Sequence, residues 1–122
     1  MAKCDQGYLC RICNQEVEKL SESELYLRFV IGEIDPETLH LSSECHLDCN
    51  PVLAQFIDDH RYAGQSQVPE GFRIEDLDPK YVTQRKQLVT RGYQRLLEIQ
   101  ANRKAFSQVQ DYPLEEFKRR WR

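Results

Sequence analysis

Four side chains of metal-binding types fall into two closely spaced pairs, and this spacing constrains the fold of the 122-residue chain more than any other feature. Cys10 and Cys13 form a Cys-x-x-Cys pair, and His46 and Cys49 form a His-x-x-Cys pair. Two intervening residues let both members of a pair point at one centre, and tetrahedral zinc favours thiolate and imidazole ligands. We therefore predict one structural Cys3His zinc site formed by these four residues.

Two further cysteines leave alternatives for the ligand set. Cys45 could share a face with Cys49 in a helical turn, but it would point about 100° away from His46, so the two would not both join Cys49 on one ion. We favour His46. Cys4 is within reach of the same ion as an alternative ligand, although a free thiol is the simpler interpretation. An odd total of five cysteines also argues against a purely disulfide framework.

Neighbouring residues predict how such a site would be supported. Three thiolates around one Zn²⁺ leave a negative charge, which Arg11 or backbone amides would offset, and Asp48 is a candidate to orient the imidazole. Four protein ligands leave no open coordination position, as a catalytic zinc would need. The His-x-Glu and His-Glu-x-x-His patterns of zinc enzymes are absent from the sequence. We therefore expect a structural role for the metal.

The first part of the chain predicts a hairpin followed by a helix. Residues 4–19 are interpreted as a short hairpin around the first cysteine pair. Ser21 and Glu24 match a capping box, which favours a helix over residues 25–31. The alternation of apolar residues in that segment also fits a strand. Gly32 ends the segment in either case.

Four further segments have a proline at the start of a predicted helix: residues 35–39, 50–60, 78–102, and a short helix from Pro113 that ends in the basic run of residues 118–122. In the second, a buried apolar stripe would extend to His60. The third is the longest, with Tyr81, Val82, Leu88, Val89, Tyr93, Leu96 and Ile99 on one face. Gly92 lies in that face and predicts close approach of another element. Arg85 lies there too, with its stem snorkelling or its guanidinium paired to a carboxylate of the acidic half.

These elements predict one mainly helical α+β domain over residues 1–122. Its zinc-binding part, residues 4–61, combines a zinc knuckle or hairpin with helices. A loop over residues 63–71 leads to the helical C-terminal part, residues 72–122, with a long helix and a short terminal helix. No segment approaches the roughly 20 apolar residues of a membrane span, and the start lacks the apolar core of a signal peptide. We expect a cytoplasmic protein.

Charge is distributed unevenly along the chain. Residues 1–78 hold 6 Lys/Arg and 16 Asp/Glu, a net charge of −10, whereas residues 79–122 hold 11 Lys/Arg and 4 Asp/Glu, a net charge of +7. The two halves can attract each other within one fold, which we favour, or the basic half can bind an acidic partner.

The order of the two ligand pairs, with a helix after the second, resembles treble-clef and LIM-like zinc fingers over roughly residues 4–61. The segments GYLCRIC, LYLRFVIGEIDPETLH and HLDCNPVLAQFI are similar to segments of an uncharacterised family of small bacterial zinc-binding proteins. The resemblance implies a zinc-binding fold and supplies no activity.

We predict a protein-interaction module with an unidentified protein partner. One alternative is a nucleic-acid-binding protein that uses the basic C-terminal half, although an overall pI near 5.6 is unlike such proteins. Another is a nuclease-like enzyme with Glu33, Asp35 and His40 near the finger, a weaker interpretation because this segment has an equally good interpretation as a turn and a helix cap.

Overall fold

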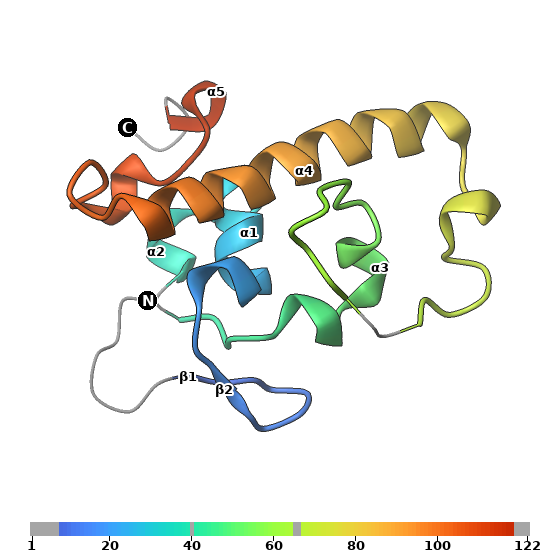
Figure 1. Ribbon diagram of the computed structural model, residues 1–122, viewed down its shortest axis with the longest axis horizontal. Helices are drawn as coiled ribbons and strands as arrows, with labels where there is room; N and C mark the ends of the chain where they lie inside the picture. Colours follow the sequence, from blue (N-terminus) through green and yellow to red (C-terminus); the bar gives the residue numbers. More distant parts are fainter. Residues whose placement is uncertain (1–7, 40, 65–66, 119–122) are drawn as a thin grey trace.

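A computed structural model describes residues 8–39, 41–64 and 67–118, and it is mainly helical, as predicted (Figure 1). The α-helices are α1 (Glu24–Val30), α2 (Pro36–Leu39), α3 (Pro51–Ala54), α4 (Pro79–Ala101) and α5 (Glu115–Lys118). The 3-10 helices are η1 (Leu20–Glu22), η2 (Leu47–Cys49), η3 (Ile74–Asp76) and η4 (Val109–Asp111). Strands β1 (Tyr8–Leu9) and β2 (Glu16–Val17) form a two-stranded antiparallel sheet. The 23-residue α4 crosses the long dimension of the molecule.

The hairpin expected around the first cysteine pair is present. Tyr8 lies opposite Val17, and Leu9 lies opposite Glu16. Beyond the strands, the N–H of Cys10 donates to the carbonyl of Gln15 at 2.8 Å. We call residues 8–17 the Cys hairpin.

Residues 24–30 are a helix, as favoured, but the cap differs from the prediction. Ser23, rather than Ser21, accepts a hydrogen bond from the N–H of Tyr26 at 3.0 Å. Glu24 does not reach back to close a capping box, because its buried carboxylate accepts from the side chain of Asn50 at 2.7 Å. Gly32, with φ of 82°, follows the helix at the predicted end.

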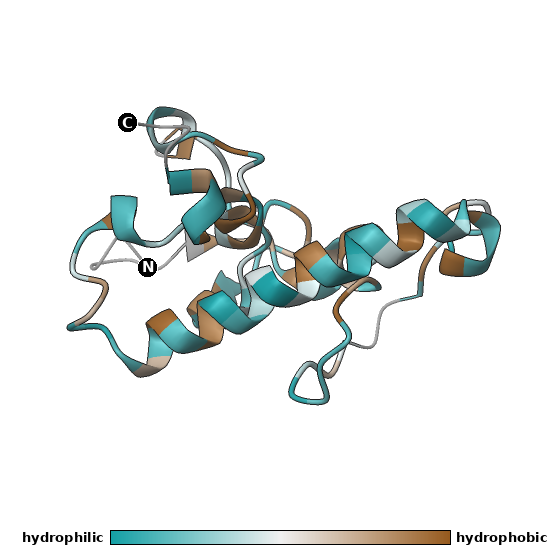
Figure 2. Ribbon diagram, turned by 90° about the horizontal axis from the view of Figure 1, so that it is seen from above, coloured by the Kyte–Doolittle hydropathy of each residue, from teal (hydrophilic) through white to brown (hydrophobic). Residues whose placement is uncertain are grey.

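The main core lies between α1 and α4. Leu27, Phe29 and Val30 of α1 are fully buried, as are Val89, Leu96 and Ile99 of α4. Apolar residues recur along α4 among hydrophilic ones, as expected for a helix with one face on the core (Figure 2). Two residues of the predicted apolar face are not fully buried: Tyr81 is 49% exposed and Leu88 is partly buried. The buried face of α4 is therefore narrower near the N-terminus of the helix than predicted. Among the described residues no helix combines the length and apolar character needed to cross a membrane.

The helix after Asn50 is shorter than predicted. It ends at Ala54 instead of continuing to His60, whose side chain is 93% exposed and not part of a buried stripe. The N–H of Asp58 donates to Thr90 Oγ1 of α4 at 2.8 Å, and that hydroxyl donates to the carbonyl of Phe56 at 3.1 Å. Thr90 of α4 thus bonds the N–H of Asp58 and the carbonyl of Phe56, two backbone groups that a longer helix would bond internally.

The segment after η4 contacts the end of α1. The N–H of Leu114 donates to the carbonyl of Val30 at 3.0 Å, and the ring of Phe117 covers Gly32, where an added Cβ would lie 2.5 Å from the ring. The predicted short helix after Pro113 is confirmed as α5.

Gly92 is the point at which α4 approaches α1, as predicted. A Cβ at this position would lie 2.5 Å from Ile31 Cγ2 and 2.8 Å from Leu27 Cδ1. Helix propensity alone would make Gly92→Ala stabilising by about 1 kcal/mol. Overpacking at such a contact costs about 1–3 kcal/mol.

We therefore expect Gly92→Ala to lower the free energy of unfolding, as measured by chemical denaturation. Gln84→Ala, at an exposed position of the same helix, is the control and should change stability by less than about 0.5 kcal/mol. A stabilised Gly92→Ala protein would show that the helices do not meet this closely.

Candidate metal centre

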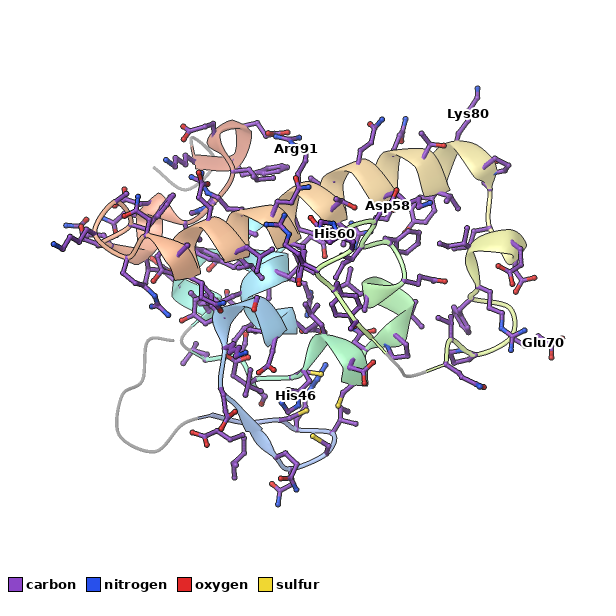
Figure 3. The ribbon with its side chains drawn as sticks, in the orientation of Figure 1. His46, Asp58, His60, Glu70, Lys80 and Arg91 are labelled. Carbon is purple, nitrogen blue, oxygen red and sulfur yellow. The ribbon has the colours of Figure 1, made fainter. Side chains whose placement is uncertain are left out.

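The structure brings together the four residues selected from the sequence. One donor atom from each of Cys10, Cys13, His46 and Cys49 lies within 4.8 Å of all the others. Figure 3 shows His46 beside sulfur atoms, between the Cys hairpin and the segment that contains η2. Two distant parts of the chain thus supply one compact cluster of three sulfurs and an imidazole, an arrangement that fits a metal ion and is typical of zinc.

Backbone hydrogen bonds connect the Cys hairpin and the start of α1 to the segment that precedes His46. The N–H of Arg11 in the hairpin donates to the carbonyl of Glu44 at 3.0 Å. The N–H of Glu24, at the start of α1, donates to the carbonyl of Cys45 at 2.8 Å. His46 then forms an isolated antiparallel bridge with Ser23. Residues 44–46 are therefore fixed between the Cys hairpin and the first turn of α1.

His46 is oriented so that one ring nitrogen faces the sulfurs. Its Nε2 lies 3.0 Å from the carbonyl oxygen of Glu16, to which only a protonated nitrogen can donate. That bond assigns the proton to Nε2 and leaves the lone pair of Nδ1 free. Nδ1 lies 3.3 Å from Cys13 Sγ and 3.9 Å from Cys49 Sγ. A tetrahedral zinc would separate such atoms by about 3.6 Å, so the observed distances bracket the required value.

The orienting partner differs from the one predicted. The sequence suggested Asp48, whereas the Nε2 of His46 is directed at the backbone carbonyl of Glu16 in β2. Any residue type supplies a carbonyl, so no sequence signal could have identified this partner.

Cys10 is buried and receives backbone N–H groups. The amides of Ile12 and His46 each lie 3.4 Å from its sulfur. Burial acts to raise the pKa of Cys10, but bonds from the backbone of Cys13, His46 and Ile12 outweigh it and lower the pKa to about 5. Backbone amides therefore offset thiolate charge, one of the two predicted means. Arg11 is instead paired with Glu24, at 3.6 Å.

The thiol of Cys49 is crowded by the other two sulfurs of the cluster. Burial, followed by the neighbouring sulfurs of Cys13 and Cys10, raises the pKa of its thiol to about 12. Three sulfurs this close repel one another as thiolates, and a bound cation removes that repulsion.

Cys45 lies beside the centre but has a different role. It is buried, and its S–H donates to the carbonyl of His46 at 3.3 Å. Burial, with the charges of Glu24 and Cys10, raises its pKa to about 12, consistent with a protonated thiol. The cluster of possible ligands includes His46 and not Cys45, in agreement with the preference from sequence. Cys4, the other alternative, lies outside the described residues.

Two of the three candidate nuclease residues make contacts of other kinds. Glu33 forms ion pairs with Arg85 and Arg28. Asp35 accepts from the N–H of Thr38 at 2.6 Å, as a cap of α2. His40 is not among the described residues. The contacts of Glu33 and Asp35 thus support the interpretation of this segment as a turn and cap.

A pocket of about 570 Å³ adjoins the centre. Three of the four clustered residues line it, together with Lys19, Glu22, Arg61, Tyr62 and Tyr93 among others. A ligand in this pocket would meet the outer side of Cys13, His46 and Cys49, because four donors complete a tetrahedral shell.

Single substitutions test which side chains hold the metal. We expect Cys10→Ser, Cys13→Ser, His46→Ala and Cys49→Ser each to abolish zinc retention, measured by elemental analysis of purified protein. Cys45→Ser is the matched control and should retain one zinc per chain. Loss of zinc in Cys45→Ser together with retention in His46→Ala would show that the fourth ligand is misassigned.

Comparison with known proteins returned no matching family model, no matching curated protein and no matching solved structure. The resemblance to treble-clef and LIM-like fingers therefore rests on the ligand spacing, and the geometry of this chain carries the functional conclusion.

Proposed function

We propose that this protein is a small interaction module in which one structural zinc, held by Cys10, Cys13, His46 and Cys49, fixes the Cys hairpin to the helical core for contact with a protein partner. The observation that carries this proposal is the convergence of four donor atoms from two distant segments, within 4.8 Å of one another.

The need for a metal is clearest at the hairpin. Its strands have two residues each, and an isolated two-stranded hairpin is at best marginally stable in water. Cys10, Val17 and Cys45 form a small buried cluster that is separate from the main core. A zinc ion would supply the stabilisation that so small a cluster lacks. A hairpin knuckle followed by a second ligand pair also supports a treble-clef-like arrangement.

The surface of the hairpin supports an interaction role. Leu9 and Ile12 flank the buried Cys10 and are 56% and 63% exposed. A metal would hold these apolar side chains in fixed positions, so little conformational entropy would be lost when a partner covers them. The complete four-ligand set favours this role over metal catalysis.

The contacts of the basic half favour a protein partner over nucleic acid. Arg85 pairs with Glu33, as one of the two predictions for this residue specified, and Arg91 pairs with Glu116. Arg95 donates to the carbonyls of Asp111, Tyr112 and Pro113. These cations of α4 are thus engaged within the chain, which reduces the charge available to phosphates. Arg119, Arg120 and Arg122 lie outside the described residues.

Metal removal tests the structural role. We expect one zinc per chain, and its binding should contribute about 10–16 kcal/mol to the free energy of folding. In hydrogen exchange, chelation should remove protection from the amides of Arg11 and Glu24, whose acceptors lie next to the ligands, before α4 is affected. Carefully prepared protein without zinc, and with exchange unchanged by chelator, would contradict the proposal.

Substitution of the exposed apolar residues tests the interaction role. Ile12→Ser should retain zinc but lose partners recovered by affinity capture with the wild-type chain. Leu41→Ser, at another highly exposed apolar position, is the control and should recover the same partners. If nuclease treatment of the lysate removes the recovered material, or if random DNA or RNA binds below micromolar at about 150 mM salt, nucleic acid becomes the leading partner.

A further inference from the structure

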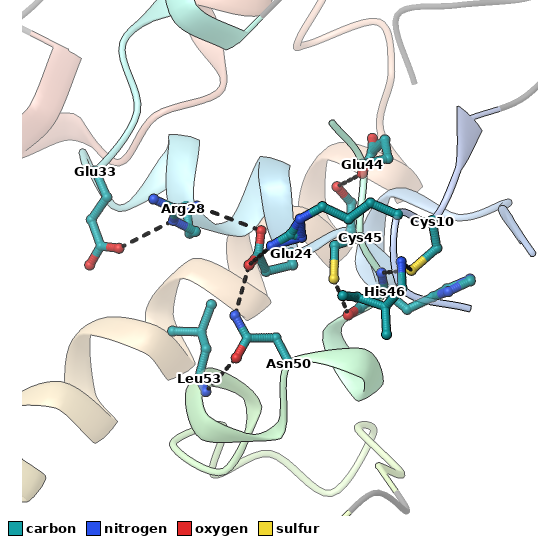
Figure 4. Close-up of polar contacts among 12 residues, drawn as sticks. Cys10, Glu24, Arg28, Glu33, Glu44, Cys45, His46, Asn50 and Leu53 are labelled. Carbon is teal, nitrogen blue, oxygen red and sulfur yellow. Dashed lines mark hydrogen bonds and ion pairs between the residues drawn. The ribbon is translucent and has the colours of Figure 1, made fainter. Parts of the chain in front are cut away.

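A chain of alternating charges lines a second pocket, of about 290 Å³. Its order is Arg11, Glu24, Arg28, Glu33 and Arg85, and Figure 4 shows the part around Glu24, Arg28 and Glu33. The residues come from the Cys hairpin, from α1, from the segment after α1 and from α4. The pocket is therefore formed where the Cys hairpin meets the helical core.

The arginines of this chain have unused hydrogen-bonding capacity. Arg11 and Arg28 approach Glu24 at 3.6 and 3.8 Å, and Arg28 approaches Glu33 at 3.7 Å. These separations are attractive for charges but exceed hydrogen-bonding distance. Among the described residues, the guanidinium groups of Arg11 and Arg28 make no shorter bond, and these side chains are 44% and 39% exposed. Each guanidinium has five N–H donors, so both can bind a further acceptor.

Charge in the pocket is unbalanced. Three guanidinium groups face two carboxylates, which leaves one positive charge. Oε2 of Glu24 accepts from the side-chain amide of Asn50, a bond that holds this carboxylate in place without using either arginine. One additional carboxylate would neutralise the pocket, whereas a phosphate dianion would exceed the excess charge and be repelled by Glu24 and Glu33.

The remaining walls fit the stem of a side chain. Val52, Leu53, Phe56 and Tyr81 line the pocket beside the arginines. An apolar wall beside guanidinium groups lowers the local dielectric and strengthens a carboxylate–arginine contact, and the planar fork of arginine can bind both oxygens.

We propose that this pocket binds the carboxylate of a Glu or Asp side chain in an acidic segment of a protein partner. The proposal rests on the proposed function, because Arg11 is placed by the metal-bound hairpin and precedes the exposed Ile12. A partner would insert its carboxylate among Arg11, Arg28 and Arg85 while an apolar neighbour covers Ile12.

The test measures binding of an acetylated and amidated Leu-Glu-Glu-Phe peptide by titration followed with NMR chemical shifts. A peptide with Gln in place of both Glu residues is the probe control, and inorganic phosphate is a second probe. We expect the acidic peptide to bind the zinc-loaded chain more tightly than either. Equal binding of the Gln peptide, or tighter binding of phosphate, would overturn the assignment of a carboxylate.

Substitutions give effects of opposite sign. Arg28→Gln should weaken peptide binding tenfold or more, and Arg28→Lys, which keeps the charge opposite the buried Glu24 but lacks the fork, should weaken it severalfold.

Glu33→Gln should tighten binding, because it removes a competing carboxylate and releases Arg85. Arg103→Gln, at an exposed arginine outside the pocket, should leave binding unchanged. Unchanged or weaker binding in Glu33→Gln would overturn the proposal, since a purely structural network gains nothing from that substitution.

Zinc content separates this inference from the proposed function. Each variant should retain one zinc per chain. A zinc-loaded wild-type chain that does not bind the peptide would overturn only the carboxylate pocket, whereas a wild-type chain without zinc would overturn the proposed metal site itself.

Discussion

The arrangement of the N-terminal half depends on the contacts of one residue, His46. Its two nitrogens connect different parts of the chain: Nε2 is held by the carbonyl of Glu16 in β2, and Nδ1 faces the sulfurs of Cys13 and Cys49. The same residue donates its backbone N–H to the sulfur of Cys10. One side chain therefore fixes the hairpin to the segment before η2, and a metal bound at Nδ1 would reinforce contacts that already converge on it.

The helical half is organised by a close approach and by internal pairing of charge. Gly92 lets α4 lie against Leu27 and Ile31, so two helices share one core. The opposite net charges of the two halves are then used across that contact, since Arg85 of α4 meets Glu33. Arg91 and Arg95 of α4 are likewise engaged, with Glu116 and with carbonyls of residues 111–113, so three cations of the long helix are held within the chain.

The sequence predicted the features that depend on local spacing. The Cys-x-x-Cys and His-x-x-Cys pairs predicted that four donor atoms converge, and the prolines and Gly92 predicted the helix starts and the close helix contact. These expectations were met because the relevant partners are few residues away or the residue type allows few alternatives. It did not predict the end of α3, where Thr90 of the distant α4 takes over the backbone groups. It also missed the carbonyl of Glu16, which is a tertiary partner, and the shift of the cap to Ser23, because Glu24 bonds to the distant Asn50 instead of closing a capping box with Ser21. The second pocket was missed because its charged residues come from four separate segments and its apolar wall partly from a fifth.

The contact of the C-terminal segment with α1 has a consequence for the order of events during biosynthesis. All four clustered residues lie before residue 50, so every candidate ligand for a metal ion is synthesised before α4. The end of α1, by contrast, receives the Leu114 amide and the Phe117 ring only after α4 has left the ribosome. Until then the apolar face of α1 lacks the part of its core that α4 supplies, and the exposed surface favours aggregation or chaperone binding. Early metal capture would hold the start of α1 in place during that interval.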